Sequence, residues 1–104
     1  MALRPLTEEE RAAAREKAKV SRTIRAEVKE SLKKRETTIA EVLKRADNEE
    51  AVSRLKVTDL LMALPSIGEI RANAILKELN IAPSRRLRGL GVHQRRALID
   101  FLER

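Results

Sequence analysis

The 104-residue sequence contains no cysteine, no tryptophan and no tyrosine, and it has a single phenylalanine, Phe101. Without cysteine the chain can form no disulfide bond, no cysteine-ligated metal site and no cysteine nucleophile. Its one histidine, His93, excludes a multi-histidine metal site, and we expect it to be an ordinary surface residue. Because the glutamates are scattered and form no nucleophile–base–acid set, the sequence predicts a protein that is not an enzyme and that needs no metal or cofactor.

Long apolar runs are also missing. No stretch approaches the roughly 18 apolar residues that a membrane span needs, and the first five residues, Met1 to Pro5, do not resemble a signal peptide. We therefore expect a soluble cytoplasmic protein with no membrane partner. A chain of 104 residues suits one small domain, and no internal repeat divides it.

What the sequence does contain is an excess of positive charge. Lysine and arginine total 23 against 16 aspartates and glutamates, which gives a formal net charge of +7. Residues 1–35 hold 11 basic and 6 acidic side chains, and residues 85–96 hold five arginines and no acid. Such an excess can simply keep a protein soluble, but its concentration in two regions favours a polyanionic partner, most simply nucleic acid.

The first region, residues 1–35, predicts one long helix as a unit of its own. Thr7 and Glu10 have the spacing of a capping box, and no glycine or proline follows up to residue 35, which gives about 28 helical residues. An apolar ribbon occupies every fourth position: Val20, Ile24, Val28 and Leu32. We expect the C-terminal half to dock on a core through this ribbon and the alanine-rich N-terminal half to project into solvent.

The cations of this helix lie on one side. At 100° per residue, six of them fall within an arc of roughly 80°: Arg11, Arg15, Arg22, Arg25, Lys29 and Lys33. A solvated helix laced with i, i+4 ion pairs is the alternative, and a coiled-coil arm is disfavoured because the seam lacks leucine and isoleucine before Val20. The one-sided stripe favours phosphates along a groove, and we expect Arg22, Arg25 and Lys29 to contact DNA.

Residues 36–104 predict a small helical core rich in leucine and isoleucine. Apolar residues recur at helical intervals, Pro65 ends one of the helices, and a final helix is expected from Gln94 to Arg104. Two pairs have capping-box spacing: Thr38 with Glu41, and Ser66 with Glu69. No period-2 run suggests a strand, so the predicted fold is all-α, with a long N-terminal helix followed by this core.

The segment from Leu64 to Ala72 predicts a short hairpin between two helices. Pro65 and Gly68 interrupt the apolar pattern, and the amides at the following helix N-terminus form an anion site that a ligand can approach closely at glycine. The spacing resembles the helix-hairpin-helix class of sequence-independent DNA binders, although proline and glycine can equally be plain connectors. We expect Ile67 and Ile70 to pack against the core.

A second candidate element is the loop from Ala82 to Gly91, which carries three arginines and two glycines. Its cations are Arg85, Arg86 and Arg88. We expect Leu87 and Leu90 to pin the loop to the core, so that the arginines are free to bind phosphates or to enter a minor groove. A role for the two leucines as a wedge between bases is the less favoured alternative.

Together these residues resemble the actinobacterial integration host factor family. The similarity covers essentially the whole chain: the two elements just described, the opening Met1-Ala2-Leu3, Leu6-Thr7, the first helix and Leu55-Lys56-Val57. The resemblance implies a helix-two-turns-helix core similar to that of a ribosomal head-domain protein and unrelated to the β-ribbon host factors. It also implies a nucleoid-associated monomer that binds double-stranded DNA with little sequence preference, through phosphates and the minor groove, and bends or compacts it.

Carried over by position, the resemblance implies DNA contacts from the hairpin and from an arginine-rich lid, Ala82 to Gln94. The implied contacts are Leu64, Pro65, Ser66, Ile67, Gly68, Glu69, Ile70 and Arg71 in the hairpin, and Arg85, Arg86, Arg88, Gly89, Gly91 and Gln94 in the lid. Two positions depart from the family. Glu69 replaces a common lysine and puts an acid beside the hairpin. Arg35-Glu36 replaces a frequent glycine pair, so the first helix is expected to end later or less sharply than in the relatives.

Two other functions stay open at this point. A ribosomal or other RNA-binding module could use the same core, although ribosomal relatives carry a basic C-terminal extension and this chain stops at Phe101-Leu102-Glu103-Arg104. A helical adaptor would bind a protein partner through the long helix, and its association would not depend on salt. The two basic regions favour duplex DNA and leave RNA as the alternative.

Overall fold

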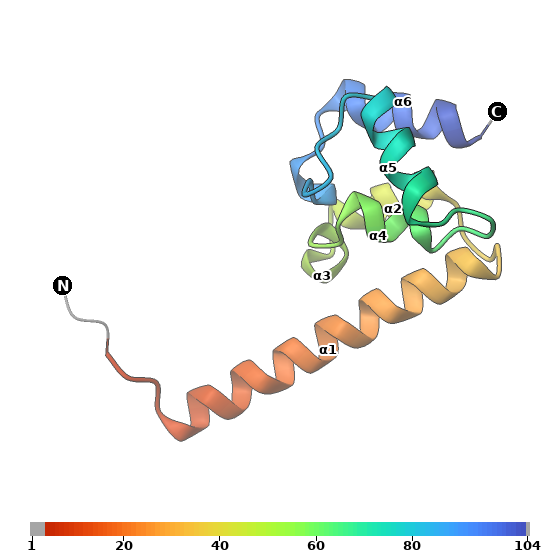
Figure 1. Cartoon of the computed structure of the whole chain (residues 1–104). Coiled ribbons are helices and arrows are strands. Elements are labelled where there is room, and N and C mark those ends of the chain that lie inside the picture. The colour runs from red at the N-terminus through yellow and green to blue at the C-terminus, as the bar shows by residue number, and fades with distance from the viewer. Residues whose placement is uncertain (1–3, 104) are drawn as a thin grey trace.

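A long helix, α1 (Glu8–Lys33), lies along one side of a cluster of shorter helices (Figure 1). The computed structural model describes residues 4–103, so Met1-Ala2-Leu3 and the expected helical end at Arg104 lie outside the described residues. The other elements are α2 (Ile39–Ala46), α3 (Glu50–Ser53), α4 (Val57–Met62), α5 (Glu69–Glu78), the 3-10 turn η1 (Leu87–Gly89) and α6 (Val92–Leu102). Residues 4–103 form no β-strand, and the all-α prediction is confirmed.

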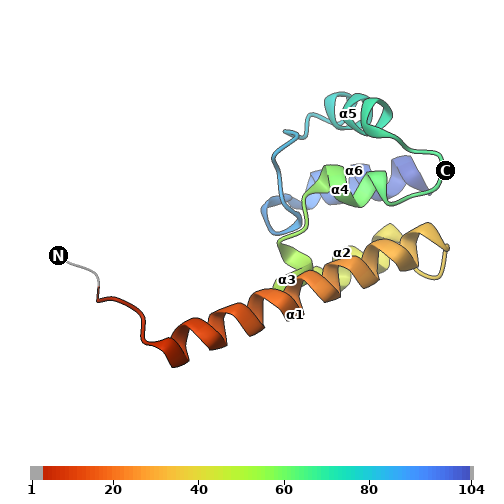
Figure 2. The ribbon, with the colours of Figure 1, turned by 60° about the horizontal axis from the view of Figure 1, so that its bottom comes forward.

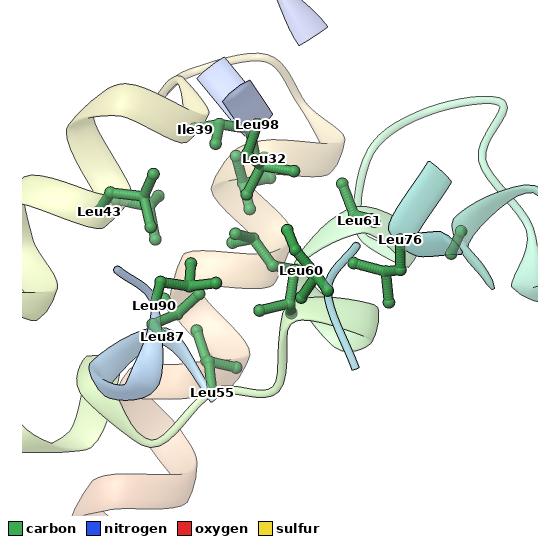
Figure 3. Packing of buried hydrophobic residues seen from close by; sticks show 14 of the residues in the cluster. Leu32, Ile39, Leu43, Leu55, Leu60, Leu61, Leu76, Leu87, Leu90 and Leu98 are labelled. Carbon is green, nitrogen blue, oxygen red and sulfur yellow. The ribbon is translucent and has the colours of Figure 1, made fainter. Parts of the chain in front are cut away.

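Leucines from most of the helices form the centre of the hydrophobic core. Figure 2 shows α1 and α5 on opposite sides of α4, and Figure 3 shows the side chains that meet between them. Six elements each supply one: Leu32, Leu43, Leu60, Leu76, Leu87 and Leu98. Each is almost completely buried, and burial of one such side chain stabilises the fold by about 1.5–3 kcal/mol.

Helix α1 behaves as its pattern predicts. The Thr7 hydroxyl accepts from the Glu10 amide at 3.1 Å, and the Glu10 carboxylate accepts from the Thr7 amide at 3.2 Å, so the capping box forms. Val28 and Leu32 of the apolar ribbon are buried, whereas Val20 is 48% exposed. The helix is therefore anchored at its C-terminal end, and its N-terminal half extends beyond the core (Figure 1).

The end of α1 is set by backbone hydrogen bonds. The helix stops sharply after Lys33, because the Glu36 amide donates to the Ser31 carbonyl at 2.8 Å and the Arg35 amide donates to the Leu32 carbonyl at 3.1 Å. These are the two bonds of a Schellman motif, which places Arg35 in the left-handed region at φ 61°. The helix thus ends sharply even though arginine occupies the position where relatives often have glycine, and the left-handed arginine backbone costs about 1–2 kcal/mol.

Two helix starts differ in detail from the expectation. At α2 the Thr38 hydroxyl caps the Glu41 amide at 3.2 Å, but the Glu41 carboxylate accepts from the Thr37 hydroxyl at 3.0 Å, so only half of that box forms. The last helix begins at Val92, two residues before the expected start at Gln94.

Candidate nucleic-acid interface

The lid is fixed to the core at several points. Leu87 and Leu90 are buried, as expected for its apolar anchors. The Leu87 amide donates to the Leu55 carbonyl, and the Val57 amide donates to the Arg85 carbonyl, both at 2.9 Å. The lid is thereby held beside the segment that leads into α4.

This pairing creates a cleft of about 410 Å³ between α1, the start of α4 and the lid. We call it the cationic cleft, and its charged residues are Arg25, Lys29, Arg54, Lys56, Arg86, Arg88 and one acid, Asp59. Five of the six cations, all except Arg54, form no ion pair with a described carboxylate, and four of these five, at positions 25, 29, 56 and 88, also donate no side-chain hydrogen bond within the described residues. Positive charges that lie together without internal partners form a ready binding surface for a polyanion.

The remaining two cleft cations are partly engaged within the protein. The Arg54 guanidinium pairs with Glu50 at 2.6 Å, and Lys17 of α1 reaches the same carboxylate at 3.8 Å. Arg86 donates to the Arg54 carbonyl at 2.6 Å, which fixes its side chain along the cleft wall. These contacts tie α1, α3 and the lid together around the cleft.

Only two of the three lid arginines reach the cationic cleft. Arg86 and Arg88 line the cationic cleft, whereas Arg85 does not. Its side chain folds back and donates to the Gly89 carbonyl at 3.3 Å, and a Cβ at Gly89 would lie only 3.0 Å from the Arg85 Cδ. Glycine at position 89 therefore makes room for the arginine, and all three lid arginines line a shallow hollow on the lid.

The C-terminal end of the lid is held by internal bonds. The Gln94 side chain accepts from the Gly91 amide and donates to the Asn80 carbonyl, both at 3.2 Å. Arg95 binds Asp47 of the α2 C-terminus at 2.8 Å, and its hydrogen bond lowers the pKa of that carboxyl. The polar groups of Gln94 and Arg95 therefore bond within the protein, where they join α6 to its neighbours.

The hairpin turn has the features of a type II turn. Pro65 occupies its second position, Ser66 has a left-handed φ of 72°, and the Ile67 amide donates to the Leu64 carbonyl at 3.3 Å. A serine is strained where glycine is favoured, and the cost is about 1 kcal/mol. The turn sets the direction in which α5 begins.

The start of α5 is not capped by a side chain. The expected box between Ser66 and Glu69 was wrong, because Gly68 is the N-cap residue and the turn has already carried Ser66 away from the first amides. The first amides of a helix have no intrahelical partner, and no described side chain caps them here. Gly68 has an ordinary φ of −94°, and a Cβ there would meet nothing within 4 Å, so the fold itself does not require glycine.

A second concavity of about 680 Å³, the hairpin hollow, lies between α1 and the hairpin. Its walls are Ala26, Lys29, Glu30 and Lys33 of α1, Asp59, Met62 and Ala63 of the α4 segment, and Leu64 to Ile67. Lys29 and Asp59 line both the hollow and the cationic cleft. The inner end of the α1 stripe, the hairpin and the lid therefore border one continuous side of the protein.

Some candidate residues line neither the cleft nor the hollow. Arg22, on the same face of α1 as Lys29, lines a shallow exposed stretch farther out along the helix, and Arg71 lines an apolar groove with Arg35. Ile70 was expected to pack inside but is 89% exposed, because the inner face of α5 is formed by residues 72, 75 and 76. Ile67 is half-buried against the core.

Sequence reasoning missed three residues of the cleft: Arg54, Lys56 and Asp59. Nothing in their local pattern distinguishes them from solvated charges on a short helix, and only the pairing of the lid with residues 55–57 brings them beside the lid arginines. Within residues 4–103, no three metal-ligating side chains gather at one point, and no helix has the length and apolar character to cross a membrane.

Comparisons with known proteins place these features in a family. Residues 32–101 match the family model of the S13-like H2TH domain. The integration host factor of Mycobacterium tuberculosis is 52% identical over 100 residues, 96% of this chain and 95% of that protein. That of Streptomyces coelicolor is 48% identical over 94 residues, 90% of this chain and 88% of that protein.

A solved structure described as sIHF bound to an 8bp palindromic DNA is also similar. It matches with a TM-score of 0.78 at 42% identity, over 80% of this chain and 93% of that chain. The helical arrangement and the sequence therefore agree with the same group of proteins.

Proposed function

The chain belongs to the integration host factor family with an S13-like H2TH domain, and we propose that it is a DNA-binding protein of the nucleoid. Like its relatives, it is a host factor rather than an enzyme. Duplex DNA is the proposed partner, bound by a monomer through phosphates and the minor groove, with little sequence specificity. The DNA-bound state of the sIHF structure supports this partner.

The single observation that carries the proposal is the cluster of unpaired cations in the cationic cleft. Arg25, Lys29, Lys56 and Arg88 gather from three segments without internal carboxylate partners. Bringing like charges together is unfavourable unless an anion offsets it, and a DNA backbone supplies anions at short intervals along its length. The uncapped amides of α5 add a second phosphate site that uses dipoles rather than charge.

We further propose that the protein bends the duplex and that Ile70 contributes to the bend. Leu87 and Leu90 are buried and cannot leave the core to act as wedges. Ile70 is 89% exposed in the first turn of α5, next to the amides proposed to hold phosphates. An apolar side chain beside a phosphate site can press between base steps in the minor groove and open them.

The proposal is tested by measuring affinity for several unrelated duplexes across a salt series. We expect similar affinities for all sequences and a steep linear fall of log affinity with log salt, because each phosphate contact contributes a slope of about −0.9. A structured RNA serves as competitor. Association that ignores salt, or an RNA that displaces DNA at equal concentration, would contradict the proposal.

Bending is tested by fluorescence transfer between dyes at the two ends of a short duplex. Addition of the protein is expected to shorten the end-to-end distance, and Ile70→Ala is expected to reduce the shortening while most of the affinity remains. Val92→Ala is the matched control, because Val92 is also an exposed β-branched residue, 79% exposed, at the start of a helix. Equal effects of the two variants would remove Ile70 from the bending mechanism.

A further inference from the structure

One acidic side chain interrupts the cationic cleft. Asp59, in the first turn of α4, is exposed and lies on the wall of both the cleft and the hairpin hollow. It is the only acid among the residues that line the cleft, where six cations accompany it. Within residues 4–103 its carboxylate forms no ion pair and accepts no hydrogen bond.

An unpartnered carboxylate is unfavourable on a surface that binds phosphates. The phosphate and sugar oxygens of DNA are acceptors, so they offer a carboxylate no hydrogen bond and the phosphates repel it. The donors that DNA presents to a protein are the exocyclic amino groups on its base edges. In the minor groove the only such donor is the N2 amino group of guanine.

The position of Asp59 relative to the two phosphate sites points to that groove. Asp59 lies where the cleft and the hollow meet, with the cleft cations on one side and the hairpin on the other. The two backbones of a duplex face each other across a minor groove about 6 Å wide. When the cleft cations hold one strand and the hairpin turn lies against the other, a side chain between the two lies over the groove.

We propose that Asp59 accepts a hydrogen bond from the N2 amino group of a guanine in the bound duplex. The inference rests on the proposed function and gives it a specificity: a preference for a G·C pair at one position, superimposed on binding that is otherwise indifferent to sequence. The neighbouring cations hold the DNA close to the carboxylate, and the amino group supplies the donor that no described residue provides.

The test compares four duplexes that differ only at the central base pairs: G·C, inosine·C, A·T and 2,6-diaminopurine·T. Inosine removes the 2-amino group of guanine, and diaminopurine adds it to adenine, without a change in the major groove. We expect the wild-type protein to bind both duplexes with the 2-amino group about three- to tenfold more tightly than the other two. In Asp59→Ala this preference is expected to disappear while the affinity for A·T rises.

Glu30→Gln is the matched control, since Glu30 also lines the hairpin hollow but is paired with Lys34 at 3.6 Å. It removes the same charge and is expected to raise all four affinities equally, with the preference intact. Thermal melts establish that each variant is folded. A wild-type preference that is absent, that follows the major-groove pattern or that survives in Asp59→Ala overturns the inference. Failure of the wild-type protein to bind any of the duplexes in dilute buffer would instead overturn the proposed function.

Discussion

The lid and the hairpin border the same side of the protein but are built in opposite ways. The lid brings side-chain charge: its arginines are held by buried leucines and by backbone bonds to the segment before α4. The hairpin brings no cation to the hollow, and the first turn of α5 that follows it contains an acid, Glu69. What it offers is a helix end whose first amides are left uncapped, with open space at Gly68.

This difference separates two contributions to phosphate binding. Charged side chains release counterions from DNA, so their contribution falls steeply with salt. Backbone amides carry only partial charges, and their contribution depends on how closely a phosphate can approach. Variants in the two regions should therefore differ in how salt changes their effect on affinity as well as in the size of that effect.

The largest effect is expected from the lid. Arg86→Ala/Arg88→Ala removes two cleft cations and should lower duplex affinity by about 30- to 100-fold in dilute buffer and reduce the magnitude of the salt slope by about two. The control is Arg45→Ala/Arg96→Ala, which removes the same charge from ion pairs outside the cleft and the hollow. Fluorescence anisotropy across a salt series gives both quantities, and an unchanged slope in the lid variant would exclude the lid from the interface.

The hairpin is probed by Gly68→Ala, which adds one methyl group at the N-cap of α5. We expect affinity to fall by about tenfold with no change in salt slope, because the methyl blocks close approach and removes no charge. Thermal stability should fall only slightly, since a Cβ meets nothing within 4 Å and alanine is a poorer N-cap residue than glycine. Gly91→Ala is the matched change at the N-cap of α6, where a Cβ also has room. Equal losses in the two variants would argue against a phosphate at the hairpin.

Adding positive charge next to the hairpin tests the comparison with the lid in the opposite direction, by a gain of affinity instead of a loss. Glu69→Lys replaces a repulsive carboxylate with a cation and should tighten duplex binding about three- to tenfold in dilute buffer and steepen the salt slope by about one. Glu78→Lys makes the same change at the far end of α5. A gain of the same size there would mean that the effect reports net charge rather than contact at the hairpin.

The smallest effect concerns stability alone. Arg35→Gly should raise the free energy of unfolding by about 1 kcal/mol, since glycine adopts the left-handed conformation of the Schellman motif without strain. Lys34→Gly, at a φ of −85°, should lower it by about 0.5–1 kcal/mol. Chemical denaturation measures both values. Because Arg35 lines neither the cleft nor the hollow, duplex affinity should stay the same, and a large loss would extend the interface to the end of α1.

Several features of the fold follow from local pattern. The Thr7–Glu10 capping box and the apolar ribbon that ends at Leu32 act within one helix, so the sequence predicts α1 and its anchored end correctly. The Leu87 and Leu90 anchors are also local, because apolar residues that flank arginines in a loop have only the core to pack against. The excess of positive charge can also be read from the sequence alone, because charge is additive along a chain. This excess indicates a polyanionic partner.

Other features depend on which segments meet. The inner face of α5 is set by α4 and the neighbouring helices, and this leaves Ile70 on the surface, although the pattern of apolar residues indicates a core position. The direction of the hairpin turn decides that Ser66 does not cap α5. The backbone pairing of Arg85 and Leu87 with residues 55 and 57 decides which arginines line the cleft.

Composition and helical periodicity alone thus determined an all-helical, strongly basic protein with one projecting helix, because these properties depend on neighbours a few residues apart. Tertiary structure decided the rest. It formed the cleft in which Arg25 and Lys29 lie near Arg88, and it placed the single acid Asp59 among these cations. A binding surface depends on distances between segments far apart in the chain, and these distances are fixed only when the common core forms.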